Sequence, residues 1–334
     1  MEKLSILGLG LIGGSVGLGL KAGKFENLEI WGFDREWGVG PRAQKAGAID
    51  RYAGSAAAAV RDAAVVVIAT PVLAARELFR EIAPDLREGA VVIDTCSTKA
   101  QVVRWASELL PPHVEFVGGH PMAGKTESGL AAADAALFRD RPFVLTPGPD
   151  ASERSIAIAR ALVEALGAKP VFMDPEEHDS YVAAVSHLPL LTSVALFTVA
   201  QQSQAWPELA QLAAGGFLDT TRLASGEPEM AHDIFLTNGG NVVHWLDRYV
   251  AMLTEFRKLI AEGQSEELFE RLSRARLERE RFLANPFGLR KEPAPEVPST
   301  GETLASLLVG AAVVRRMKEV NRIFDEPGRP GERR

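Results

Sequence analysis

A glycine-spaced turn between two short apolar strands is the feature that most limits what this chain can fold into. An apolar run at 4–7 leads into Gly8, Gly10 and Gly13, and a helical pattern then connects to a second apolar run at 30–33. In such a unit the first glycine permits a tight turn, the second lets a ligand approach the backbone, and the third lets the helix pack on the sheet. The pattern predicts a β-α-β unit with a pyrophosphate site at the start of its helix.

The residues after these glycines indicate which dinucleotide is bound. The free N–H groups at Leu11 and Ile12 begin the helix, where the helix dipole favours a negative charge. Asp34 follows about twenty residues after Gly13, where a carboxylate can accept the ribose hydroxyls and repel a 2′-phosphate. We therefore expect NAD as cofactor, although Arg35 could pair with such a phosphate. The alternative is a glycine-rich turn in an ordinary α/β protein, which the placement of the acid disfavours.

Composition and charge narrow the class of protein. The 334 residues are 46% apolar and 24% charged, which is typical of globular proteins and long enough for two domains. A net charge of −7 argues against nucleic acid or an anionic membrane as partner. The single cysteine, Cys96, allows no internal disulfide and no zinc cluster, so we expect a cytoplasmic protein without a metal site. We also expect no signal peptide and no membrane span, since no uninterrupted run of about eighteen apolar residues occurs.

Strand and helix patterns alternate up to residue 173 and then give way to helices. The runs 65–68 and 91–93 are continuously apolar, as in strands buried on both faces of a parallel sheet. We predict a doubly wound α/β nucleotide-binding domain of the Rossmann type at 1–173 and an all-helical domain at 174–286. The remaining segment, 287–334, is expected to be a Pro-rich linker followed by a terminal helix and a polar tail. Strands are expected at 4–8, 29–33, 64–69, 90–94, 115–118, 142–145 and 169–172; helices include 73–82, 99–109, 152–166, 176–204, 205–214, 228–240, 242–262 and 266–283.

Ligands of such sheets bind at the carboxyl ends of the strands, so polar residues there are candidate site residues. Thr70 and Pro71 follow one strand and are expected to line the cofactor, although a helix start with proline in its first turn explains them almost as well. Ser97 and Thr98 follow the next strand. Both have a structural alternative as N-caps of the helix near Lys99, and Ser97 is also a candidate for contact with nicotinamide or substrate.

His120 is the candidate general base. It follows a predicted strand, is preceded by two glycines and is fixed by Pro121, so we expect its imidazole to face the nicotinamide. Loss of hydride from an alcohol requires a base for the hydroxyl proton, and imidazole titrates near neutrality. A capping or core histidine is the alternative, which the strand-end position disfavours.

Several motifs together resemble one enzyme family. The run Gly118–Gly124 (Gly-Gly-His-Pro-Met-Ala-Gly) is followed by Ser128-Gly129, by Ser186-His187-Leu188-Pro189 and by Asp219-Thr220-Thr221-Arg222. In this order and spacing they are similar to the prephenate and arogenate dehydrogenases of tyrosine biosynthesis, over about residues 1–285.

The resemblance implies an activity and roles for particular residues. It implies a nucleotide-binding domain, a helical domain that dimerises, and NAD(P)-linked oxidative decarboxylation of a cyclohexadiene to a phenol. By analogy His120 is the general base, Ser97 orients the hydroxyl and the nicotinamide, and Arg222 holds the side-chain carboxylate of the substrate. Ser186 and His187 would line the substrate pocket. A guanidinium suits an anchor because its planar fork pairs bidentately with a carboxylate, and none of these steps requires a metal.

Two positions depart from the family pattern and bear on the substrate. Leu190 stands where many relatives carry a second histidine, and Thr126, followed by Glu127, stands where many carry an acid. Either the loop is shifted by one residue, so that Glu127 takes this place, or the acid no longer guards the pocket. An acid there could pair with the amino group of arogenate, whereas prephenate has a keto group, so we favour prephenate over arogenate or dual specificity. Two less favoured hypotheses are a two-domain hydroxy-acid or imine dehydrogenase, for which no convincing catalytic lysine is found, and a non-enzymatic NAD sensor, which retention of His120 and Arg222 disfavours.

The helical part of the sequence also predicts self-association. The stretch 182–199 is apolar nearly all round and 207–217 is short and ends in glycines, which together favour a homodimer through the helical domain over a helix buried inside one chain. Beyond residue 285 we expect too little chain for the βαββαβ regulatory module that some relatives append.

Overall fold

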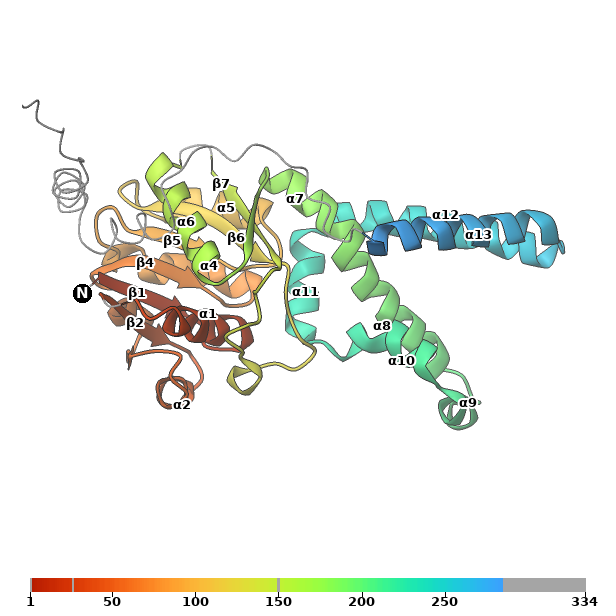
Figure 1. Ribbon diagram of the computed structural model, residues 1–334, viewed down its shortest axis with the longest axis horizontal. Coiled ribbons are helices and arrows are strands. Elements are labelled where there is room, and N and C mark those ends of the chain that lie inside the picture. The colour runs from red at the N-terminus through yellow and green to blue at the C-terminus, as the bar shows by residue number, and fades with distance from the viewer. Residues whose placement is uncertain (1, 26, 149–150, 285–334) are drawn as a thin grey trace, which may run out of the picture.

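The protein consists of a sheet domain and a helical half that extends away from it in two arms (Figure 1). The computed structural model describes residues 2–25, 27–148 and 151–284. One arm is formed by α8 to α10 and the other by the antiparallel pair α12 and α13, while α7 and α11 lie next to the sheet (Figure 1). This arrangement confirms the predicted fold class. The linker, helix and tail predicted at 287–334 lie outside the described residues.

The sheet has eight strands in the order β3-β2-β1-β4-β5-β6-β7-β8. The first strand of the glycine unit lies inside the sheet, since β1 pairs in parallel with both β2 and β4. One pair departs from the expected parallel sheet, because β7 runs antiparallel to β6. The strands are β1 Glu2–Leu7, β2 Leu28–Phe33, β3 Arg51–Tyr52, β4 Ala63–Ile68, β5 Val91–Asp94, β6 Glu115–Pro121, β7 Pro142–Pro147 and β8 Lys169–Phe172.

Helices cover both faces of the sheet and make two separate cores. On β4 the side chains alternate, since Val65 and Val67 face one core while Val66 and Ile68 face the other. All four are buried, as expected for a strand covered on both sides. The covering helices are α1 Leu11–Ala22, α2 Val39–Lys45, α3 Ala56–Val60, α4 Val72–Ile82, α5 Ala100–Leu109 and α6 Glu153–Ala165.

The described residues from Pro175 to Ala284 form helices and their connections. The single helix expected at 176–204 is divided by a π-helical turn, Ala183–His187. Pro189 lies in the first turn of the helix that follows, and its missing N–H accounts for the wider turn. The segment 215–225, for which no helix was predicted, is helical as well. The elements are α7 Pro175–Val182, α8 Leu188–Gln201, α9 Trp206–Leu212, α10 Gly215–Thr221, the short 3-10 helix η4 Arg222–Ser225, α11 Pro228–Thr237, α12 Gly239–Ala261 and α13 Ser265–Ala284.

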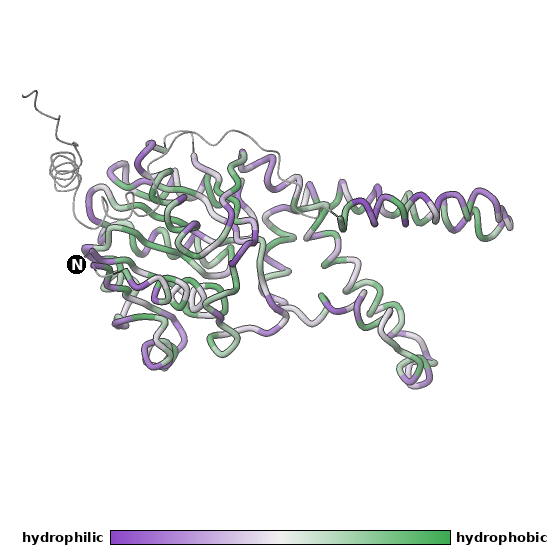
Figure 2. Tube along the Cα trace, viewed as in Figure 1, coloured by the Kyte–Doolittle hydropathy of each residue, from purple (hydrophilic) through white to green (hydrophobic). Residues whose placement is uncertain are grey.

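The continuous helix formed by α7, the π turn and α8 exposes apolar side chains. By length and composition alone this stretch, Pro175–Gln201, could cross a membrane, although a search for one uninterrupted apolar run predicted no span. Val185 and Val199 are more than 70% exposed, and Figure 2 shows hydrophobic residues along the α8 to α10 arm outside the sheet domain. These side chains require cover from lipid or from another protein surface.

Side chains of the helical half cap the N-termini of two helices in the sheet domain. Neither α4 nor α5 has a side-chain cap from its own N-cap residue. Asp233 on α11 accepts the Leu73 N–H of α4 at 2.9 Å, and Asp179 on α7 accepts the first N–H groups of α5. Carboxylates suit these places because a helix N-terminus carries free donors and partial positive charge. The alternative role of Ser97 and Thr98 as N-caps of α5 is therefore wrong.

Candidate active site

The glycine turn has the geometry of a pyrophosphate-binding loop. Gly8 has a φ of +91°, which only glycine adopts without strain, and a Cβ at Gly13 would overlap the Gly8 carbonyl. By contrast, a Cβ at Gly10 would meet nothing within 4 Å, so the backbone before Leu11 and Ile12 is open to a ligand. The backbone therefore requires Gly8 for the turn and Gly13 for packing, and the open space at Gly10 is compatible with the predicted approach of a ligand.

Asp34, at the end of β2, is tied to the glycine turn before any ligand arrives. Its Oδ2 accepts the Leu9 N–H at 2.7 Å, and its Oδ1 accepts the Glu36 N–H at 2.8 Å. Each oxygen keeps a second lone pair for a ribose hydroxyl. The neighbouring Arg35 points to the helical half, where its Nη2 lies 3.5 Å from Oε1 of Glu229 on α11.

Thr70 and Pro71 connect β4 to α4 beside this turn. Pro71 is the N-cap residue of α4, and the Thr70 methyl group lies close to Gly8. The Thr70 hydroxyl is buried and has no hydrogen-bond partner among the described residues. A buried hydroxyl without a partner costs stability, so its position beside the glycine turn fits a polar ligand such as a dinucleotide.

His120 lies within β6 and not after it. The strand continues to Pro121 because β7 pairs with it antiparallel, which places His120 opposite Val144. The two glycines before His120 are needed for packing: a Cβ at Gly118 would overlap Thr146, and one at Gly119 would overlap the Asp94 carbonyl. They allow β6 to lie close to both neighbours, which fixes the backbone that carries the histidine.

A hydrogen-bonded chain of three side chains orients the His120 ring. His120 Nδ1 lies 2.8 Å from His178 Nε2, and His178 Nδ1 lies 2.8 Å from Asp179 Oδ1. Because a carboxylate only accepts, His178 donates from Nδ1 and accepts at Nε2, so His120 donates from Nδ1. This tautomer leaves a lone pair on His120 Nε2, which is the atom a general base needs.

Asp179 is itself held by the start of α5. Its Oδ1 accepts the Lys99 N–H at 2.7 Å and its Oδ2 accepts the Ala100 N–H at 3.0 Å. Both His178 and Asp179 are buried. A carboxylate bound by two backbone donors at a helix N-terminus remains an acceptor, which fixes the direction of the whole chain.

A buried ion pair holds the residue before His120. Lys99 Nζ pairs with Asp94 and donates to the Gly119 carbonyl at 2.7 Å, while Asp94 Oδ1 accepts the Gly119 N–H at 3.0 Å. Both side chains are fully buried. The backbone pairing of β5 with β6 ends at Ile93 and Val117. Beyond it, the Asp94 and Lys99 side chains form the hydrogen bonds to the Gly119 backbone.

Burial and nearby positive charge keep His120 neutral. Burial is the main cause that lowers the pKa of His120 well below its usual 6.5, and His178, Lys99 and His187 lower it further. The sequence suggested an imidazole that titrates near neutrality. With this lowered pKa, His120 is instead already unprotonated at neutral pH. A neutral ring with a free Nε2 can accept a proton without first losing one.

His187 ends the π turn and is completely buried. Its Nδ1 accepts a hydrogen bond from Asn238 at 3.2 Å, which leaves a proton on Nε2, and this atom has no partner among the described residues. Burial lowers the pKa of His187 to about 4. Ser186, its neighbour in the same turn, is half-buried.

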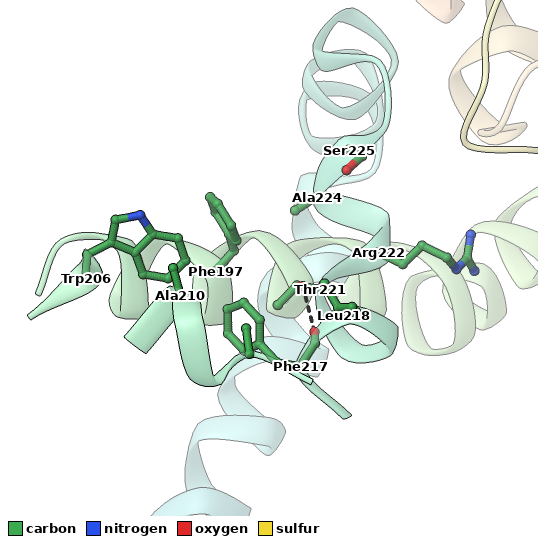
Figure 3. A pocket seen from close by; sticks show the side chains of 10 residues that line it. Phe197, Trp206, Ala210, Phe217, Leu218, Thr221, Arg222, Ala224 and Ser225 are labelled. Carbon is green, nitrogen blue, oxygen red and sulfur yellow. Dashed lines mark hydrogen bonds between the residues drawn. The ribbon is translucent and has the colours of Figure 1, made fainter. Parts of the chain in front are cut away.

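The remaining predicted residues lie at different distances from this centre. Ser97 is half-buried between β5 and α5, whereas Thr126 lies in the loop after β6, where its hydroxyl donates to Glu127 at 3.3 Å. Arg222 is exposed at the start of η4. It lines a cavity of about 470 Å³ formed by α8, α9, α10 and η4. Figure 3 shows the Arg222 side chain pointing away from the aromatic rings of that cavity, and His120 is not among the residues that line it.

Comparison with known proteins identifies the family. Residues 16–172 match the nucleotide-binding domain of prephenate dehydrogenase, and residues 174–274 match its dimerization domain. The chain belongs to the prephenate dehydrogenase family. It is 36% identical to the prephenate dehydrogenase of Bacillus subtilis over 80% of this chain and 72% of that one.

Solved structures of family members match most of this chain. A prephenate dehydrogenase from Aquifex aeolicus in complex with hydroxyphenyl propionate and NAD+ matches with a TM-score of 0.78 and 30% identity, covering 84% of this chain and 98% of that one. The Synechocystis arogenate dehydrogenase matches with a TM-score of 0.71 and 29% identity, covering 84% and 99%. As a family member this chain is an NAD-dependent oxidoreductase.

Sequence reasoning missed several polar residues around the base of this dehydrogenase. His178 and Asp179 were passed over as ordinary residues of a predicted helix, and no role was given to Asp94, Lys99 or Asn238. The adjacent His-Asp pair, one turn after a helix start, was the available signal. Polar residues on an otherwise apolar helical segment must find partners when buried.

Proposed function

We propose that this chain is a prephenate dehydrogenase that uses NAD for the oxidative decarboxylation of prephenate to 4-hydroxyphenylpyruvate. The observation that carries the proposal is the oriented, neutral His120, whose unprotonated Nε2 lies at the carboxyl edge of the sheet that bears the dinucleotide loop. Family membership supplies the reaction class, and the chain of His178 and Asp179 supplies a base fixed in the required tautomer.

The reaction requires little beyond alignment and one proton transfer. NAD held by the Gly8–Gly13 turn and Asp34 would supply the acceptor for the hydride on the ring carbon that carries the hydroxyl group. His120 Nε2 accepts the hydroxyl proton as the C–O bond becomes a carbonyl, and positive charge on its ring is shared through His178 with Asp179. The ring carboxylate then leaves as carbon dioxide, its bonding electrons enter the ring, and protonation of the carbonyl oxygen gives the phenol.

The substrate contacts are proposed from the family motif and the chemistry of each side chain. Ser97, half-buried beside the Asp94–Lys99 pair, orients the hydroxyl group of the substrate. His187 offers a buried Nε2–H donor without a partner among the described residues, Ser186 and Thr126 line the pocket, and Arg222 anchors the side-chain carboxylate. Thr126 in place of an acid favours prephenate, and an arogenate or dual-specificity enzyme is the second candidate, because Glu127 adjoins it.

We propose a homodimer in the cytoplasm formed through the helical half. The exposed apolar side chains of α7 and α8 support this, because the matching family domain is described as a dimerization domain. A second copy, in place of lipid, would cover Val185 and Val199. Analytical ultracentrifugation of the parent and of the variants Val185→Asp and Val199→Glu tests this. We expect the parent to sediment as a dimer and both variants to dissociate into monomers more readily. A parent monomer at micromolar concentration would contradict it.

The activity is tested by following NADH absorbance with prephenate and arogenate offered separately, each with NAD and NADP. We expect the highest kcat/KM for prephenate with NAD, and one carbon dioxide released per NADH formed. Equal or higher kcat/KM for arogenate would favour the second candidate. Absence of turnover with both compounds would refute the proposed activity.

A further inference from the structure

Helix α11 crosses the carboxyl edge of the sheet with one polar stripe. Its contacting residues are four apart, so they share one face of the helix. The contacts reach residues after β2, after β4 and after β5, three strands of the nucleotide-binding domain. They are Glu229 with Arg35 at 3.5 Å, Asp233 with the Leu73 N–H at 2.9 Å, and the Thr237 hydroxyl with that of Thr98 at 2.9 Å.

The dimensions of helix and sheet agree with this crossing. From Glu229 to Thr237 an α-helix rises about 12 Å, and three strand spacings from β2 to β5 measure about 14 Å. In the sheet order β1 lies between β2 and β4. The stripe therefore passes the end of β1, where the glycine turn begins, and Glu229 stands at the β2 side, where the adenosine ribose of a dinucleotide binds.

The two charged contacts of the stripe differ in burial. Asp233 is 2% exposed and caps α4, so it belongs to the packing between the two halves. The Glu229 and Arg35 side chains are 56% and 74% exposed, and the fold does not depend on their pairing. The pair instead sets the local charge next to Asp34, where a ligand would bind.

We propose that Glu229 is a cofactor-specificity residue that withholds the Arg35 guanidinium from a 2′-phosphate. Arg35 directly follows the ribose-binding acid, where a guanidinium could pair bidentately with a phosphate. Glu229 occupies that guanidinium and adds a second negative charge on the side from which the phosphate would approach. Discrimination against NADP is thus shared between Asp34 of the nucleotide-binding domain and a residue of the helical half. This inference rests on the proposed use of NAD.

Direct binding tests the inference independently of turnover. Titration calorimetry of the full-length chain with NAD, NADP and adenosine 2′,5′-bisphosphate is compared for the parent, Glu229→Gln and Glu229→Lys. Because an exposed pair is weak, we expect Glu229→Gln to tighten binding of the two 2′-phosphate ligands about three- to fivefold, and Glu229→Lys more. The Kd for NAD should stay within about twofold, and the gain should shrink at high salt.

Two control variants make the result specific. Glu81→Gln removes an exposed acid at the far end of α4 and should leave every Kd unchanged. Adding Arg35→Gln to Glu229→Gln should cancel the gain, because the guanidinium is then missing. If both Glu229 variants bind NAD normally but bind the 2′-phosphate ligands no more tightly, the specificity role is refuted while the proposed function stands. If the parent fails to oxidise prephenate with either cofactor, the proposed function fails, and the binding comparison still decides the role of Glu229.

Discussion

The carboxyl ends of β5 and β6 and the α8 to α10 arm contribute residues to the same proposed site. They differ in how many contacts one chain provides around those residues. Around His120 the polar groups are buried, paired and fixed by backbone donors. Around Arg222 the walls are apolar and open, and the guanidinium is exposed. The proposed base is therefore oriented by contacts within one chain, whereas the proposed anchor has no comparable set of contacts among the described residues.

Replacement of the base should give the largest effect. We expect His120→Asn to lower kcat about 10²- to 10⁴-fold, because the hydroxyl proton then has no acceptor. The Kd for NAD, measured by calorimetry, should not change. His113→Asn, at the opposite end of β6, is the matched control and should retain activity. A kcat within a factor of three of the parent would remove the base assignment.

Replacement of the proposed anchor should affect binding more than chemistry. Loss of a charged hydrogen bond predicts that Arg222→Gln raises KM for prephenate about 10- to 100-fold with little change in kcat. Arg222→Lys should recover part of the loss, and Arg274→Gln on α13 controls for net charge. A fall in kcat at unchanged KM would show that Arg222 is not an anchor in the ground state.

Replacement of Asp179 tests whether its carboxylate orients the proposed base. Asparagine keeps one acceptor oxygen for the start of α5, but its NH2 group faces the other backbone donor, so Asp179→Asn should lower the Tm by a few degrees. It no longer fixes the tautomer of His178, and we expect kcat to fall by about tenfold. Asp174→Asn, the same substitution at the N-cap of α7, should alter neither quantity. If both variants lose activity equally, the effect is structural and the orienting role is refuted.

The smallest expected effect is a pH dependence of the unfolding free energy that comes from His187. Its pKa is about 4 in the folded chain, below the usual 6.5. The folded state therefore resists protonation, and this contribution is complete above pH 6.5 and declines as the pH falls towards 4. Between about pH 7.5 and pH 5.5 it amounts to about 1 kcal/mol. Urea unfolding at both pH values should show that His187→Gln loses less stability than the parent; equal losses would contradict the linkage.

Local patterns could be predicted from the sequence, and contacts between distant residues could not. The glycine turn and the buried run 65–68 each show their role within a few residues. His120 and His178 are 58 residues apart, and Lys99 and Asp179 are 80 apart. No periodicity relates such positions, so the orienting chain became visible only in the folded structure.

The errors of the sequence analysis have the same physical origin. The predicted strand 115–118 stops two residues before His120, whereas antiparallel pairing with β7 continues β6 to Pro121. Ser97 and Thr98 were considered as caps because such residues commonly are, whereas Asp179 supplies the cap from another helix. The division of the chain at residue 174 and the individual substrate contacts stay predictions.

The carboxylates that close the starts of α4 and α5 limit how this protein can be recombined with others. A chimaera that keeps the nucleotide-binding half but takes its helices from elsewhere must inherit acids equivalent to Asp179 and Asp233. Otherwise it leaves two helix ends bare, at about 1 kcal/mol each. Exchange of either half therefore has to preserve these two acceptors as well as the packing between the halves.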